Sequence, residues 1–146
     1  MKKSEIAVNK LKEGYNCAQS MLYSYADELN LDKNLALKIA HGFGGGMGRK
    51  QEVCGAITGG ICILGLKFGR GENDDKQVQD MNYSKVRQFI DLFEKQFGTI
   101  YCKKLLNGCE LLTKEGQERF KNEKLNEKCQ QFVRTANNII EKLISE

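Results

Sequence analysis

Six cysteines carry the most distinctive chemistry of this chain, and their spacing limits what they can do. No two of them form a Cys-x-x-Cys pair, which removes the thioredoxin motif, the zinc ribbon and the bacterial ferredoxin run together. Cysteines seven or eight residues apart in one helix are separated by about 10 to 12 Å, which is too far for a direct bridge. A joint site must therefore combine separate helices, drawing on Cys17, Cys54, Cys62, Cys102, Cys109 and Cys129.

Cys54 has the strongest local argument for reactivity. It falls in the first turn of a helix predicted from about Val53 to Leu66, just after Gly48-Arg49-Lys50. The free amides of a helix N-terminus and nearby cations stabilise a thiolate. We therefore expect Cys54 to be the most reactive of the thiols in a metal-free protein.

Helical periodicity orients three further cysteines. Cys129 lies one turn before Val133 on an apolar stripe, Cys102 shares a face with Leu105, and Cys17 flanks the apolar stripe of its own helix. All three are expected to face the interior, where four sulfurs could converge with that of Cys54.

An unpaired cysteine often behaves as a small buried hydrophobe, and this alternative applies to each of the six. We interpret Cys62, which lies within an apolar run, as a core residue. Cys109 fits either interpretation.

Glycine is concentrated in the middle of the chain, where 11 of the 15 glycines fall between Gly42 and Gly71. The run from Gly42 to Gly48 is expected to form a central loop, and it fits neither G-x-G-x-x-G nor a P-loop. Gly55 and Gly59 leave one face of the Cys54 helix without side chains. A cofactor or a neighbouring helix could approach that face closely.

Composition indicates one soluble domain. The 146 residues are 40% apolar and carry a net charge of +4 spread along the chain, which indicates solvated helix faces and argues against nucleic-acid binding. The N-terminus has no apolar h-region, and no apolar stretch is long enough to span a bilayer. We expect a single domain over residues 1–146 in the cytoplasm, where a disulfide framework is not favoured.

The fold class follows from apolar spacing of three and four residues, which recurs from Ala18 to Leu29, from Val86 to Phe97 and from Val133 to Leu143. No segment alternates with period two between turn signals. The sequence predicts an all-α, compact bundle of about six helices, including one from about Leu35 to His41.

These features together resemble a known family. The chain contains Asn16-Cys17-Ala18-Gln19-Ser20, Phe43-Gly44-Gly45-Gly46-Met47-Gly48-Arg49, Val53-Cys54-Gly55-Ala56-Ile57-Thr58-Gly59, Phe97-Gly98 before Cys102, and Cys129 before an amphipathic helix. This order is similar to that of the C_GCAxxG_C_C family of redox-active proteins over nearly the whole chain. The family label writes Gly-Cys-Ala where this chain has Cys54-Gly55-Ala56. The resemblance implies that the family's four cysteines are Cys17, Cys54, Cys102 and Cys129, and it brings no enzymatic activity with it.

Four functions remain open at this stage. The four cysteines could hold an iron–sulfur cluster, most simply 2Fe–2S, and transfer electrons to a redox partner protein. They could form a thiol–disulfide centre in which Cys54 is the nucleophile and another of the four, with Cys17 singled out, resolves it. They could bind structural zinc with the same four thiolates. The protein could also be a noncatalytic helical partner-binding subunit whose cysteines only pack in its core.

Overall fold

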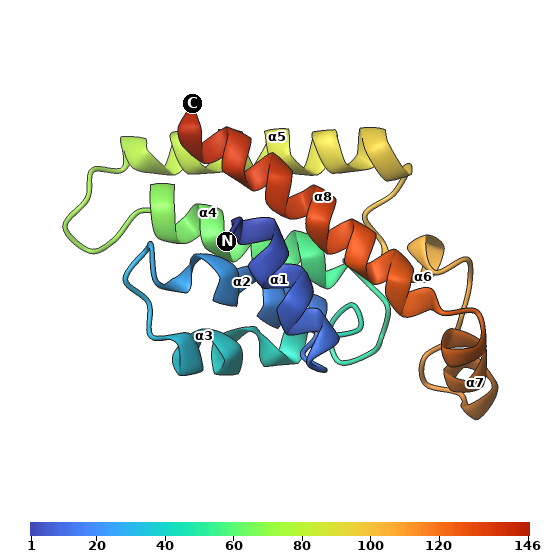
Figure 1. Ribbon diagram of the computed structural model, residues 1–146. Helices are drawn as coiled ribbons and strands as arrows, with labels where there is room; N and C mark the ends of the chain where they lie inside the picture. The colour runs from blue at the N-terminus through green and yellow to red at the C-terminus, as the bar shows by residue number, and fades with distance from the viewer.

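The computed structural model describes residues 1–146 and is all-α (Figure 1). It has no strand, and one isolated antiparallel bridge joins Val53 to Tyr101. The helices are α1 (Lys3–Lys12), α2 (Cys17–Ala26), α3 (Lys33–Ala40), the 3-10 helix η1 (His41–Phe43), α4 (Gly55–Phe68), α5 (Gln77–Phe97), α6 (Cys102–Leu105), α7 (Lys114–Asn122) and α8 (Leu125–Ser145).

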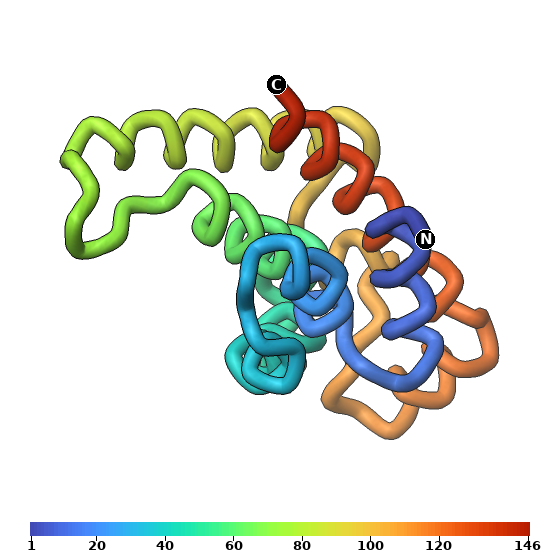
Figure 2. Tube along the Cα trace, turned by 60° about the vertical axis from the view of Figure 1, so that its left-hand side comes forward, coloured from blue at the N-terminus to red at the C-terminus, as the bar shows by residue number.

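Helix α4 lies in the middle of the molecule and packs against α2, α5 and α8. Helix α1 packs across α2 and α8, α3 packs on α2, and α7 contacts the beginning of α8. Figure 2 shows α4 and α5 running side by side away from the chain's N-terminal helices. The short helices α6 and α7 lie together at the opposite end (Figure 1).

One cluster of 27 buried apolar residues forms the core. Helix α8 contributes a stripe at three- and four-residue spacing, with Val133, Ala136, Ile140 and Leu143 almost fully buried. This stripe is the amphipathic pattern that makes a long helix stable through packing. No helix in the structure has the length and apolar content needed to cross a membrane.

The prediction of an all-α fold is confirmed, but the expected six helices are eight α-helices. Two of them have weak apolar stripes. Two of the four buried residues of α1, Ser4 and Ala7, are small, and the only buried residue of α7 is Gly116. Such helices depend on neighbouring elements, which periodicity within a window does not detect.

Candidate functional site

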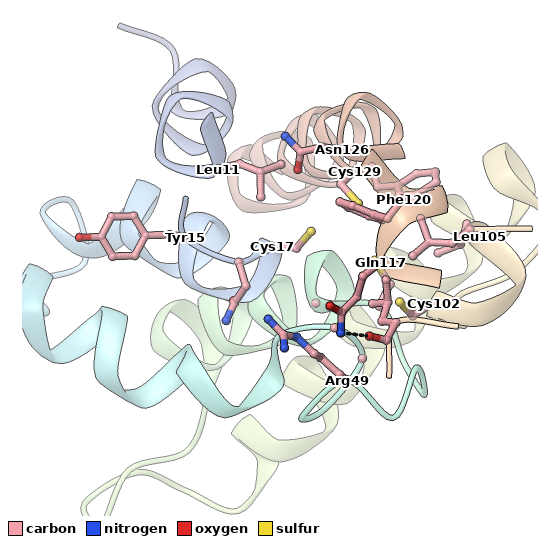
Figure 3. A pocket seen from close by; sticks show the side chains of 18 residues that line it. Leu11, Tyr15, Cys17, Arg49, Cys102, Leu105, Gln117, Phe120, Asn126 and Cys129 are labelled. Carbon is pink, nitrogen blue, oxygen red and sulfur yellow. Dashed lines mark hydrogen bonds between the residues drawn. The ribbon is translucent and has the colours of Figure 1, made fainter. Parts of the chain in front are cut away.

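A cavity of about 330 Å³ opens at the end of the molecule where α6, α7 and the beginning of α8 meet (Figure 3). The four cysteines singled out from the sequence all line it. They come from four separate segments: the start of α2, the residue before α4, the start of α6, and the first turns of α8. These are Cys17, Cys54, Cys102 and Cys129.

A short antiparallel contact brings Cys54 and Cys102 to the same wall. The backbone N–H of Cys54 donates to the carbonyl of Ile100 at 2.7 Å, and that of Cys102 donates to the carbonyl of Glu52 at 2.7 Å. The bridge between Val53 and Tyr101 lies between these two bonds. Two segments far apart in sequence are thereby locked in register, and each ends in a cysteine at a helix start.

Cys17 is held by the capping of α2. The side chain of Asn16 accepts a hydrogen bond from the Gln19 N–H at 2.9 Å, and the Gln19 side chain accepts one from the Asn16 N–H at 3.1 Å. This capping box fixes the first turn, in which Cys17 is the first residue. The Asn16 amide also donates to the His41 carbonyl at 3.0 Å, which ties this turn to η1.

Aromatic packing supports the wall on the α8 side. Phe132, one turn after Cys129, lines the cavity and meets the Phe97 ring at 5.0 Å between centroids. Phe97 in turn meets Phe93 at 4.8 Å, so α5 and α8 are joined behind the wall. Such aromatic pairs stabilise the packing of the two helices beyond the burial of their area.

The segment leading to Cys54 has an unusual backbone. Five consecutive residues, from Gly45 to Arg49, have φ between 59° and 68°, and Gln51 follows with φ 59°. This left-handed region is costly for residues with a β-carbon, so Met47, Arg49 and Gln51 are strained there. Gly46 also permits a close approach, because a β-carbon at that position would lie 2.9 Å from Cβ of Cys102.

Gln51 anchors this segment to the far side of the site. Its buried side-chain amide donates to the Cys109 carbonyl at 2.6 Å and accepts from the Leu111 N–H at 2.9 Å. The sequence analysis missed this role, because the two partners lie 58 and 60 residues away. In the sequence, Gln51 is a polar residue between charged ones, a pattern that does not predict burial or long-range hydrogen bonds.

Burial opposes the expected activation of Cys54, which stays a prediction. Helix α4 begins at Gly55, so Cys54 is its N-cap residue and does not lie in its first turn. Burial raises the pKa of the Cys54 thiol to about 12, although the N–H groups of Ala56 and Ile57 partly oppose this. Burial likewise raises the pKa of Cys102 to about 12. Desolvation of the thiolate therefore outweighs the helix N-terminus.

Cys17 and Cys129 behave as a pair. The interaction between the Cys17 and Cys129 side chains lowers the pKa of Cys129 and raises that of Cys17. Both side chains are half-buried, whereas Cys54 and Cys102 are buried. The most acidic thiol of the cavity is thus Cys129, on a different element from the one the sequence favoured.

The two other cysteines do not line the cavity. Cys62 is half-buried on α4, and the buried Cys109 thiol donates to the Gly116 carbonyl at 3.1 Å. Lys103, which follows Cys102 in the sequence, pairs with Glu110 at 3.4 Å, and neither Lys103 nor Lys104 lines the cavity.

The two candidate glycines have different surroundings. Gly55 lines the cavity, and a β-carbon there would lie 3.1 Å from Cβ of Cys17. Gly59 lies deeper, where a β-carbon would come within 2.8 Å of the Ala18 carbonyl and 2.7 Å of the Met21 Cβ. Helix α2 therefore occupies the space beside Gly59, and its role as a cofactor-binding residue stays a prediction.

Several lining residues escaped the sequence analysis. Gln117 and Phe120 belong to α7, a helix that was not predicted, and Leu11 and Tyr15 come from the end of α1 and the turn after it. Arg49 was noted only as a cation close in sequence to Cys54. It is the only charged side chain among the 18 lining residues.

The cysteines are all unpaired, and no three His, Cys, Asp or Glu side chains are grouped closely enough to hold a metal ion as they stand. The four thiols thus surround a space. The fold and this site define an all-α protein with a four-cysteine cavity.

Comparison with known proteins agrees with this class. The family model described as "Putative redox-active protein (C_GCAxxG_C_C)" matches residues 15–143, and the chain belongs to this family. An uncharacterized protein of Archaeoglobus fulgidus is 31% identical over 104 residues, which cover 70% of this chain and 66% of the relative. No solved structure matches the chain.

Proposed function

We propose that the four-cysteine cavity holds an iron–sulfur cluster through which the protein transfers electrons to a partner protein. One observation carries the proposal: four thiols from four separate segments line the same cavity, whereas Cys62 and Cys109 do not. Four thiolates are the usual ligand set of such a cluster. A noncatalytic core role would give no reason for these four thiols to border one open space.

The burial of Cys54 and Cys102 also favours a ligand role. Their side chains are 5% and 8% exposed, so a disulfide substrate has poor access to either sulfur. A ligand needs no such access once the site is assembled. Cluster binding uses all four thiols, whereas a dithiol mechanism leaves two without a function.

The charge of the cavity suits an anionic group. A cluster with four thiolates is net negative, and no carboxylate lines the cavity, while Arg49 does. Leu105, Leu106 and Phe132 form an apolar wall around the thiols. This chain would thus supply four ligands, one counter-charge and a wall that excludes water. The bound cluster would supply one-electron transfer.

Structural zinc would use the same four thiols, with each sulfur about 2.3 Å from the ion. Metal and sulfide analysis distinguishes the two sites, because a zinc site contains neither iron nor inorganic sulfide.

The test is purification without oxygen, followed by iron, sulfide and zinc analysis and a visible absorption spectrum. The proposal expects brown protein with iron and acid-labile sulfide in equal amounts. Colourless protein with stoichiometric zinc would select the structural site, and colourless, metal-free protein would overturn the cluster.

The second candidate is a thiol–disulfide centre, and the contact between Cys17 and Cys129 favours it. The Cys129 thiolate would attack a substrate disulfide and release one thiolate. Cys17 would then lose its proton, attack the Cys129 sulfur and release the second thiolate, so two electrons pass to the substrate. This replaces Cys54 as the expected nucleophile and keeps Cys17 as its partner. Mass spectrometry of metal-free protein after mild oxidation should identify a Cys17–Cys129 disulfide.

A further inference from the structure

Arg49 has no partner within the protein. Of the five arginines, Arg70, Arg119 and Arg134 donate hydrogen bonds to a carbonyl, a carboxylate or both, whereas Arg49 and Arg87 do not, and Arg87 lies away from the cavity. Arg49 forms neither an ion pair nor a hydrogen bond through its side chain. It is exposed at the edge of the cavity, on the side opposite Asn126 and Cys129 in Figure 3.

The backbone holds Arg49 there at a cost. Its φ is 65°, in the left-handed region that disfavours any residue with a β-carbon. Gly45 makes room for it, because a β-carbon at Gly45 would lie 2.8 Å from Cγ of Arg49. Glycine occupies three of the five positions in this left-handed run, and Arg49 is one of the two strained residues that carry a β-carbon.

The surroundings define what this cation could bind. The cavity lining is largely apolar, with Leu11, Leu111 and Phe120 among its residues. No lining residue carries negative charge. A guanidinium above apolar walls suits a carboxylate with a hydrocarbon body, because the planar fork matches the two carboxylate oxygens.

We infer that Arg49 anchors a small organic carboxylate in the mouth of the cavity, with the apolar body of that molecule directed toward the four cysteines. The inference deepens the proposed function by giving the redox centre a small-molecule electron donor or acceptor. It rests on that proposal only in taking the cysteines as the redox centre.

The test compares octanoate with octanamide, which share a hydrocarbon body and differ in the charge of the head group. Binding to the protein as purified is measured by titration calorimetry and by chemical-shift changes of cavity residues. We expect octanoate to bind about tenfold more tightly, as a charge-assisted hydrogen bond implies. Arg49→Gln should abolish the preference, and Arg49→Lys should keep part of it.

Lys50→Gln is the matched control, because Lys50 is the exposed neighbouring cation and does not line the cavity. It should leave the preference unchanged. Equal binding of the two probes, no binding of either, or equal losses in the two glutamine variants would overturn the inference. Arg49 would then act only as a counter-charge to the four-cysteine centre or as an ordinary surface cation.

Metal analysis of the same samples separates the two proposals. Protein without iron that still prefers octanoate would support the carboxylate site and contradict the cluster. Iron-bearing protein with no preference would contradict the carboxylate site alone.

Discussion

The two halves of α8 contrast sharply in what they pack against. The C-terminal half buries Ala136, Ile140 and Leu143 in a continuous core against α1, α4 and α5. The N-terminal half carries Cys129 and Phe132 along a cavity of about 330 Å³. One helix with one apolar stripe thus serves a filled region and an open one.

The open region is built by different means from the filled one. Its walls are held by the Asn16–Gln19 capping box, by the Gln51 amide and by a left-handed backbone run. The filled region depends mainly on apolar burial, with one buried polar contact in which the Asn137 amide donates to the Ser24 hydroxyl at 2.9 Å. Space kept open beside thiols and secured by polar contacts is typical of a functional site, where stability is given up for geometry. Substitutions around the C-terminal half of α8 should therefore affect mainly stability, and substitutions around its N-terminal half should affect mainly the amount of bound iron.

The largest expected effect separates the two kinds of cysteine. Cys54→Ser should remove nearly all bound iron while it lowers the free energy of unfolding by only about 1 to 2 kcal/mol, since serine is close in size. Cys62→Ser, outside the cavity, should keep full iron loading at a similar stability cost. Iron analysis and urea denaturation check both variants. Equal iron loading in Cys54→Ser and Cys62→Ser would contradict the assignment of different roles to the two cysteines.

Gly59→Val tests the packing beneath the site. The β-carbon would meet the backbone of Ala18 and the Met21 side chain, so α2 and α4 must separate, at a cost of about 3 kcal/mol. Because Cys17 and Cys54 begin these helices, loading should fall while far-ultraviolet circular dichroism keeps most of its helical signal. Gly65→Ala is the control, since nothing lies within 4 Å of its added β-carbon, and it should gain about 0.5 to 1 kcal/mol. If Gly59→Val kept full iron loading, the glycine face of α4 would not be part of the site.

The pH dependence of stability should reflect the buried thiols in metal-free protein. The Cys54 pKa rises from an ordinary 9.0 to about 12 on folding, so above pH 9 the unfolded chain loses a proton that the folded chain keeps. Stability therefore falls as pH rises, by about 1.4 kcal/mol per unit for this group. Urea denaturation between pH 8 and 10 should show a shallower decline in Cys54→Ala than in the parent. Parallel declines would mean that the thiol is not desolvated.

The smallest effect concerns backbone strain in the wall. Met47 has φ 68°, so Met47→Gly should relieve strain and raise the free energy of unfolding by about 0.5 kcal/mol. Lys50 lies outside the left-handed run, and Lys50→Gly should instead lower stability by a similar amount. Denaturation midpoints compare the two. A loss in both variants would show that the run carries no strain at Met47.

The sequence by itself determined the all-α class and the family. The apolar spacing of α2, α5 and α8 reflects burial on one helix face, which is local information. The same spacing oriented Cys17, Cys102 and Cys129 inward, and the structure brings these three to one cavity with Cys54. Which kind of site they form stays a prediction, because cluster, dithiol and zinc sites use the same residues.

Tertiary structure alone decided the electrostatics and the walls of the site. Cys54 sits at a helix start beside cations in the sequence, yet its pKa rises, because desolvation depends on neighbours brought from distant segments. The contacts of Gln51 with Cys109 and Leu111 and the isolation of Arg49 in the cavity are likewise invisible along the chain. Helix α7 has almost no apolar stripe to reveal it, and it supplies part of the cavity wall. Local pattern fixes which face of a helix is buried, but only the packed fold fixes what that face meets.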